Sequence, residues 1–104
     1  MPIKKNIYGD RCEFLISGRV DGELANQLEE AVLNALRSNA KQIFINLAEV
    51  SFLCSAGLRV LLQYWRQMKK DGKLLQVVSP SSEADSVLTM SGFREMIVEG
   101  TQPK

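Results

Sequence analysis

Apolar residues recur at helical spacing in two long stretches of the chain. One set lies within residues 24–36 and the other within residues 58–68, and neighbouring members are mostly three or four positions apart. This spacing places the apolar side chains on one face of a helix. Asp21 is a suitable N-cap for the first helix, and Asn39 is a suitable left-handed terminator. Gly72 is expected to end the second helix. The two sets are Leu24, Leu28, Ala31, Val32, Ala35 and Leu36, and Leu58, Leu61, Leu62, Trp65 and Met68.

Short apolar segments around these helices are typical of β-strands. Gly9 and Asp10 predict a tight turn, so the first two segments should form an antiparallel hairpin. Residues 18–22 are interpreted as a connector, and residues 50–53 as a short apolar approach to the second helix. The predicted strands cover residues 3–8, 12–17, 42–47, 73–78 and 96–98.

The order of these elements predicts the fold class. Strand–helix–strand alternation indicates parallel strands joined by crossovers, and the hairpin adds one antiparallel pair. Phe44 makes the segment at residues 42–47 apolar on both faces, which favours a central strand. A short third helix is expected to have Ser79 as its N-cap and Pro80 at its first position. We therefore expect a single α/β domain over residues 1–104, with a mixed sheet of four to five strands and three to four helices.

Length, composition and charge narrow the class of protein. A chain of 104 residues fits one domain, and its 45% hydrophobic and 24% charged residues are ordinary for a globular protein. No apolar run has the length needed to cross a bilayer, and the N-terminal residues do not resemble a signal peptide, so a cytoplasmic location without membrane insertion is expected. The net charge of +1 offers no electrostatic basis for direct binding to nucleic acid.

The chain contains no histidine. The commonest general base and the commonest metal ligand are therefore absent, which favours a protein that is not an enzyme and uses no cofactor or metal. Cys12 and Cys54 form no CxxC pair, and free thiols are expected in a cytoplasmic chain. No glycine-rich phosphate loop is present, so no nucleotide site is expected.

Three small residues, Ser55, Ala56 and Gly57, begin the second long helix. The first turn of a helix has unpaired N–H groups and a partial positive charge. A serine at this point can cap the helix, and the position would also tolerate a phosphate group. Most serines at helix starts are only caps, so the residues themselves leave both interpretations open.

Residues 50–62, VSFLCSAGLRVLL, resemble the motif of STAS domains of the anti-sigma factor antagonist family. In that motif an apolar pair precedes Asp-Ser-Ser/Thr-Gly-Leu. Residues 16–21 resemble the family's Gly-x-Leu-Asp turn before its first helix. Residues 43–47 are similar to its central strand, and residues 90–93 to its late Ser-Gly-Leu/Phe element. The matches follow the family's order and spacing over nearly the whole chain.

This resemblance implies a phosphorylation switch at Ser55. In the family, the unphosphorylated antagonist binds an anti-sigma factor that is also a serine kinase of the histidine-kinase-like ATPase type, and a sigma factor is thereby freed. Phosphorylation breaks the complex, and a serine phosphatase of the metal-dependent type resets it. By resemblance, Ser55 is the phosphoacceptor, and the chain regulates transcription through this partner switching.

Two residues depart from the family motif. Cys54 stands where many members have aspartate, and Ala56 stands where many have a second serine or threonine. Ala56 leaves Ser55 as the one acceptor in the motif. The Cys54 thiol could be nucleophilic beside a helix N-terminus, or it could be a small apolar packing residue. These departures give weight to an alternative function, an unphosphorylated STAS assembly subunit of a transport complex or signalling scaffold.

The expected partner surface surrounds Ser55. Asp21 is included because the connectors of an α/β sheet gather at one end. Val60 and Tyr64 lie one turn apart and could line this surface or pack against a neighbouring helix, while Trp65 is expected in the core. The partner-binding candidates are Asp21, Cys54, Ala56, Gly57, Arg59 and Val60.

Overall fold

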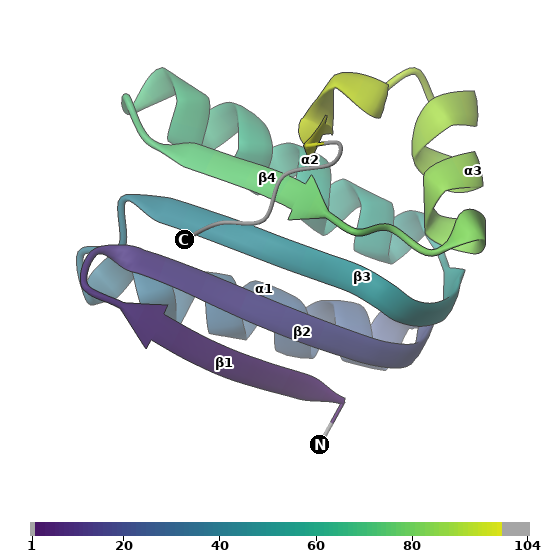
Figure 1. Ribbon diagram of the computed structural model, residues 1–104, viewed down its shortest axis with the longest axis horizontal. Coiled ribbons are helices and arrows are strands. Elements are labelled where there is room, and N and C mark those ends of the chain that lie inside the picture. The colour runs from purple at the N-terminus through teal and green to yellow at the C-terminus, as the bar shows by residue number, and fades with distance from the viewer. Residues whose placement is uncertain (1, 99–104) are drawn as a thin grey trace.

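A five-stranded sheet runs through the part of the protein that the structure describes, residues 2–98 (Figure 1). In this computed structural model the strand order is β1-β2-β3-β4-β5, with β1 antiparallel to β2 and every other neighbouring pair parallel. The strands are β1 (Ile3–Tyr8), β2 (Arg11–Val20), β3 (Gln42–Leu53), β4 (Leu74–Val78) and β5 (Ile97–Val98). The predicted α/β class, the N-terminal hairpin and the central position of β3 are confirmed.

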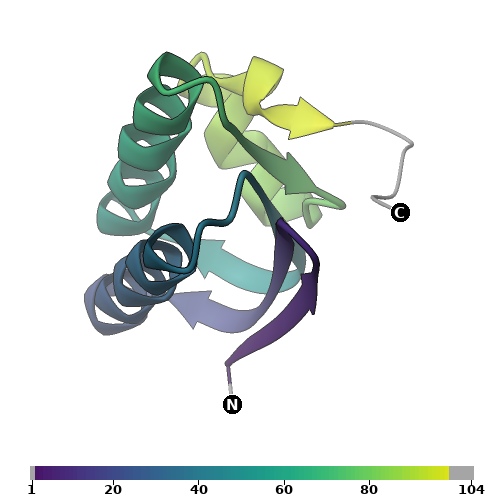
Figure 2. The same cartoon turned by 90° about the vertical axis from the view of Figure 1, so that its left-hand side faces the viewer.

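Three α-helices and one short 3-10 helix connect the strands within residues 2–98. They are α1 (Gly22–Arg37), α2 (Ser55–Lys70), α3 (Ser82–Met90) and η1 (Arg94–Met96). Helices α1 and α2 contact each other and cover the same face of the sheet (Figure 2), whereas α3 packs against β3. Asn39 and Gly72 have positive φ angles of 68° and 74°, which confirms the predicted ends of α1 and α2. No helix among these is long and apolar enough to cross a membrane.

Alternate side chains of β2 and β3 form the floor of the core beneath α1 and α2. The parallel register places Cys12 beside Ile43 and Phe14 beside Ile45, and all four are at most 3% exposed. Burial raises the pKa of the Cys12 thiol, so Cys12 serves as an apolar core residue. Cys12 and Cys54 are both free, as expected.

A β-bulge interrupts the pairing of β2 with β3 just after Asn46 and gives β3 an extra residue. The bulge frees backbone groups that must find other partners. The side-chain Oδ1 of Asn46 accepts a hydrogen bond from the N–H of Ala48 at 3.0 Å. The carbonyl of Leu47 accepts one from the N–H of Ser81, also at 3.0 Å. This second bond ties the chain entering α3 to the middle of the sheet.

Both β2 and β3 are longer than predicted. The connector expected at residues 18–22 is wrong, because β2 continues to Val20. Residues 50–53, interpreted as a separate approach to the second helix, belong to β3. The physical reason is that shifts in register let pairing continue past Gly18, whose φ is +90°, and break the period-two pattern on which the prediction relied.

The third helix starts later than predicted. Ser81, not Ser79, is its N-cap, and the Ser81 hydroxyl accepts a hydrogen bond from the N–H of Ala84 at 3.1 Å. Ser79 has a φ of +48°, so the chain makes a left-handed turn there, and Pro80 precedes the helix. The extra residues are needed because the main chain first bonds to β3 and only then enters α3.

Helix α2 buries a wider face than the predicted stripe. Val60 and Tyr64, placed off that stripe, are only 6% and 3% exposed, and the Tyr64 hydroxyl donates a 2.7 Å hydrogen bond to Oε2 of Glu29 in α1. Leu62 and Trp65 are half-buried and pack against the core from its margin. The difference arises because α2 rests on the sheet and on α1 together, and a single apolar stripe reveals only part of such a face.

Gly57 allows α2 to begin directly against the sheet. A Cβ atom at this position would lie 2.7 Å from Cγ1 of Val20 and 2.8 Å from Cδ1 of Leu53. Both separations are far shorter than normal carbon–carbon contacts, and the β-branched Val20 side chain has little freedom to move. The start of α2 therefore sits on the ends of β2 and β3 only because residue 57 has no side chain.

We predict that Gly57→Ala destabilises the protein. Overpacking typically costs about 1–3 kcal/mol, which exceeds the roughly 1 kcal/mol that alanine gains over glycine in a helix. Gly22→Ala is the matched control, because Gly22 also lies in the first turn of a helix but nothing stands within 4 Å of its added Cβ. Urea unfolding should show a lower free energy of unfolding for Gly57→Ala and no decrease for Gly22→Ala. Equal effects of the two substitutions would contradict the close approach.

A second prediction concerns stability at alkaline pH. Burial of the ring, together with the hydrogen bond to Glu29 and its negative charge, raises the pKa of Tyr64 from 10.0 to about 12. The folded state therefore holds the phenolic proton more tightly than the unfolded state, so this stability is complete below pH 10 and is lost as the pH rises to about 12. Each pKa unit corresponds to about 1.4 kcal/mol, and solvent around the partly buried hydroxyl screens much of this, so the loss should be on the order of 1 kcal/mol.

Tyr64→Phe isolates this contribution from other groups that titrate in the same range. At pH 8 the variant should be less stable than the parent by about 1 kcal/mol, because it lacks the hydrogen bond. Between pH 10 and pH 12 the parent should lose stability more steeply than Tyr64→Phe in chemical unfolding curves. Parallel curves for the two proteins would show that Tyr64 does not titrate with folding.

Candidate functional site

The carboxyl ends of β2 and β3 bring two helix starts together. Val20 pairs with Leu53, and the N–H of Cys54 donates a 3.0 Å hydrogen bond to the carbonyl of Val20. Asp21 follows Val20 and leads into α1, while Ser55 follows Cys54 and opens α2. Asp21 and the small-residue segment therefore lie at one end of two adjacent strands, as the sequence predicted from the way connectors gather.

The two helix starts are capped differently. In α1, Oδ1 of Asp21 accepts a 2.9 Å hydrogen bond from the N–H of Leu24, so Asp21 is the N-cap that the sequence predicted. In α2 the N-cap is Cys54, which makes no side-chain capping bond, and the first turn has no acidic residue. The first turn of α2 thus keeps the backbone donors and the partial positive charge that an acidic cap would otherwise compensate.

Ser55 is the first residue of α2 and not its cap. The interpretation of its hydroxyl as an N-cap is therefore wrong, because the preceding residue already occupies that position. The first helical hydrogen bond runs from the N–H of Leu58 to the carbonyl of Cys54 at 3.0 Å, so the amides of residues 55–57 precede the helical ladder. Ser55 is exposed, and none of the hydrogen bonds found within residues 2–98 uses its hydroxyl. The hydroxyl is accordingly available to a partner.

The predicted partner-binding residues fall into an exposed group and a buried group. Asp21 and Arg59 are exposed, and Cys54 and Ala56 are half-buried beside Ser55. Gly57 and Val60 are buried, the latter at 6% exposure. They cannot contact a partner directly and can affect binding only by positioning the residues that they support. Val60 packs in the core with Tyr64, which is the second of the two roles considered for these residues.

A cation–aromatic pair at the same end of the sheet was missed by the sequence reasoning. The guanidinium carbon of Arg19 lies 4.4 Å from the ring centroid of Phe52, and the Phe52 side chain is 39% exposed. Arg19 pairs with Phe52 just before the end of β2, so the pair borders Cys54 and Asp21 along the chain. The available signal is Phe52, an exposed aromatic residue in an apolar segment, but the connector expected at residues 18–22 leaves no strand partner for it.

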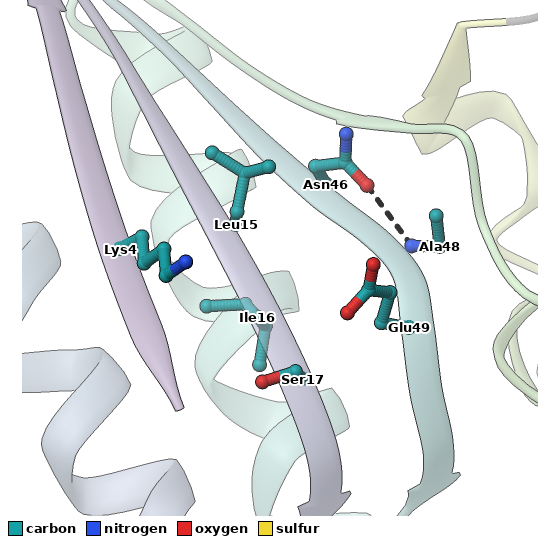
Figure 3. Close-up of a pocket in the computed structure, with 7 residues that line it drawn as sticks. All are labelled: Lys4, Leu15, Ile16, Ser17, Asn46, Ala48 and Glu49. Atoms are coloured by element: carbon teal, nitrogen blue, oxygen red, sulfur yellow. Dashed lines mark hydrogen bonds between the residues drawn. The ribbon is translucent and has the colours of Figure 1, made fainter. Parts of the chain in front are cut away.

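A cavity of about 210 Å³ lies on the face of the sheet away from α1 and α2 (Figure 3). It opens at the bulge, and it is lined by Lys4, Leu15, Ile16, Ser17, Asn46, Ala48 and Glu49. The oxygen of Asn46 is already engaged by the N–H of Ala48, as the dashed line shows. The cavity contains none of the residues around Ser55. No cluster of three or more potential metal ligands was found within residues 2–98.

Comparison with known proteins shows which family this chain resembles. The model of the STAS domain family matches residues 2–104. The anti-sigma-B factor antagonist of Staphylococcus epidermidis is 23% identical over 97 residues, which cover 91% of this chain and 90% of that protein.

Solved structures share the fold. The anti-sigma factor antagonist SpoIIAA in its unphosphorylated form matches with a TM-score of 0.85 at 19% identity, covering 96% of this chain and 89% of that one. The phosphorylated form of SpoIIAA, the Bacillus cell fate determinant, matches with a TM-score of 0.79 at 19% identity, covering 96% and 92%. The family model spans residues 2–104, and the fold matches SpoIIAA over most of both chains. The chain therefore belongs to the STAS domain family.

Proposed function

We propose that this protein is an anti-sigma factor antagonist that works by partner switching. The unphosphorylated form binds an anti-sigma factor with serine kinase activity through the surface around Ser55, and phosphorylation of Ser55 breaks that complex. The observation that carries the proposal is the exposed Ser55 hydroxyl at the first residue of α2, without an acidic neighbour in that turn. Curated relatives that align with most of this chain are anti-sigma-B factor antagonists.

The start of α2 is suited to carry a phosphate without unfolding. The amides of the first turn and the helix dipole favour a negative group at this point. Arg59 is exposed and lies four residues after Ser55, so both side chains project from the same side of the helix. These groups can offset the charge of a phosphate within the free protein, and we therefore expect phosphorylation to change the surface and leave the backbone nearly unaltered.

The same phosphate would weaken the binding of a partner whose surface is complementary to the unmodified Ser55 hydroxyl. Phosphorylation adds about −1.5 to −2 charges near neutral pH, and burying such a group in an existing contact carries a desolvation cost. A hundredfold loss of affinity requires about 2.8 kcal/mol, which this cost can supply. A switch of this kind needs no conformational change, because the modified atom lies inside the contact.

The proposed contact surface consists of exposed and half-buried residues around Ser55. Asp21 and Arg59 supply charges of opposite sign, and Cys54 and Ala56 supply small surfaces that permit close approach. Gly57 and Val60 support the surface from below. In this proposal the kinase provides ATP and the catalytic groups, a metal-dependent serine phosphatase reverses the modification, and the chain acts in the cytoplasm without a cofactor and without touching DNA.

An assembly role is the second candidate function, and one observation favours it. Cys54 caps α2 without a side-chain hydrogen bond, whereas many family members have an aspartate at this position. If that carboxylate helps to orient the serine for phosphoryl transfer, its absence here suits a STAS domain that binds a transport or scaffold complex and stays unmodified.

The decisive experiment incubates the protein with ATP and a co-encoded serine kinase of the histidine-kinase-like type, and locates phosphate by mass spectrometry. Phosphate should appear on Ser55 and be absent from Ser55→Ala. Ser51→Ala is the matched control, because Ser51 is an exposed serine four residues earlier and should not affect labelling. Phosphorylated protein should bind the kinase about a hundredfold more weakly than the unmodified form. Failure of labelling by every co-encoded kinase, with binding retained, would favour the assembly role.

A further prediction addresses the unusual cap. Cys54→Asp should stabilise the protein by about 0.5–2 kcal/mol, because a carboxylate at the N-cap can accept a first-turn N–H and interacts favourably with the helix dipole. Cys54→Ala is the control and should change stability little, since the thiol makes no capping bond. Thermal unfolding of the three proteins at neutral pH measures both effects. A loss of stability in Cys54→Asp would mean that the half-buried site cannot accommodate a charge.

A further inference from the structure

The outer edge of β1 presents unpaired backbone groups in the part of the chain described here. Within residues 2–98, β1 has a neighbour on one side only. A two-residue turn closes the hairpin, so Tyr8 and Arg11 exchange hydrogen bonds, and the N–H of Ser17 donates to the carbonyl of Pro2 at 2.9 Å. Hydrogen-bonded pairs alternate along an antiparallel ladder. The backbone groups of the alternate residues 3, 5 and 7 therefore point away from β2, towards the open edge.

A groove runs beside this edge, between β1 and α1. Its larger part is a cavity of about 430 Å³ with an apolar floor and wall formed by Ile3, Phe14 and Ala31. Lys5 and Glu30 lie at its rim. Residues that are directly opposite in an antiparallel pair share one face of the sheet, so Ile3 and Lys5 face α1 together with the core residues of β2.

A second, smaller cavity of about 40 Å³ continues the groove along β1. It is lined by Lys5 and Ile7 on the strand and by Ala35 and Ala40 beyond them. The first cavity is centred on residues 3 and 5 and the second on residues 5 and 7. Their spacing thus corresponds to about two residues of extended chain, or roughly 7 Å. Alternate side chains of a strand have this spacing.

We propose that β1 and this groove form a docking site for an extended peptide segment of another protein. The segment adds a sixth strand to the sheet by hydrogen bonding to residues 3, 5 and 7, and its alternate apolar side chains enter the two cavities. Main-chain bonds supply affinity and the cavities supply specificity, as in other cases of strand addition. The larger cavity takes a bulky apolar side chain and the smaller one takes a small side chain.

The charge of β1 indicates which side chains the added strand should carry between those that enter the cavities. These intervening side chains point to the opposite face of the sheet, where Lys4 and the 57%-exposed Tyr8 lie on β1. β1 contains two lysines and no acidic residue, and the carboxylates of this face, Glu13 and Glu49, lie on β2 and β3, farther from an added strand than Lys4. Acidic intervening residues are therefore favoured, whereas a second copy of β1 would bring the lysines of both copies to one junction. The occupant is an acidic, alternating segment and not another copy of this chain.

This site is separate from Ser55 and does not rest on the proposed function. The groove follows an edge strand and the flank of α1, whereas Ser55 follows the central strand β3. A failure of one proposal leaves the other intact.

The test uses capped synthetic peptides in which glutamate alternates with Val, Leu, Ile or Phe, titrated to about 1 mM into isotope-labelled protein, a level that detects even weak binding. The amide signals of Ile3, Lys5 and Ile7 should shift, and their hydrogen exchange should slow. N-methylation of the peptide nitrogens that face β1 should weaken binding about tenfold or more, because two or three main-chain hydrogen bonds are lost.

Variants of the protein test the groove and the charge separately. Ala31→Tyr fills the larger cavity and should weaken binding at least tenfold, while Gln63→Tyr, at an exposed position of α2, should not. Lys4→Glu should reverse the preference, so that a peptide with lysine in place of glutamate binds better than the acidic one. This reversal cannot arise from a merely damaged fold.

Three outcomes would overturn the proposal. The first is the absence of any shift at β1 with the whole set of peptides. The second is a set of shifts centred on Ser55. The third is protection of the β1 amides that grows with protein concentration without peptide, which would identify a second copy of the chain as the occupant.

Discussion

The contact between Gly57 and the ends of β2 and β3 is the constraint on which the candidate site depends. With Val20 and Leu53 only 2.7–2.8 Å from the position of a Cβ atom, the first turn of α2 lies directly on the sheet. That position brings Ser55 to the end of the same pair of strands that delivers Asp21. A side chain at residue 57 would push the start of α2 away from the sheet. The distance between Ser55 and Asp21 would then change as well.

The site is a product of the sheet's irregularities as much as of its regular pairing. The bulge after Asn46 lets the carbonyl of Leu47 bond to the chain entering α3, and it allows β3 to continue to Leu53. Without the extra residues, the ends of β2 and β3 would not lie side by side, and the carbonyl of Val20 could not accept the hydrogen bond from the N–H of Cys54. The same extension places Arg19 over the ring of Phe52, which gives this end of the sheet an exposed aromatic group as well as charges.

The sequence predicted the parts that follow local rules. The order of elements, the hairpin turn, the Asp21 cap and the left-handed Asn39 could all be read from periodicity and from the conformational preferences of single residues. It did not predict that Cys54 occupies the cap position of α2, because a residue that caps without a side-chain bond leaves no compositional signal. For Val60 the sequence left two roles open, and the pairing of Arg19 with Phe52 was missed, since both depend on partners distant in the sequence.

Helix α1 borders both the surface around Ser55 and the groove along β1. Binding at one surface can affect the other only if α1 moves. Its N-cap, Asp21, lies at the same end of β2 and β3 as Ser55, and one flank carries Ala31 in the groove along β1. Another flank is held to α2 by the hydrogen bond between Glu29 and Tyr64. A phosphate on Ser55 would add charge at an exposed atom without displacing any of these packed contacts. The two surfaces should then act independently, because a modification couples distant sites only when it shifts a structural element that both of them share.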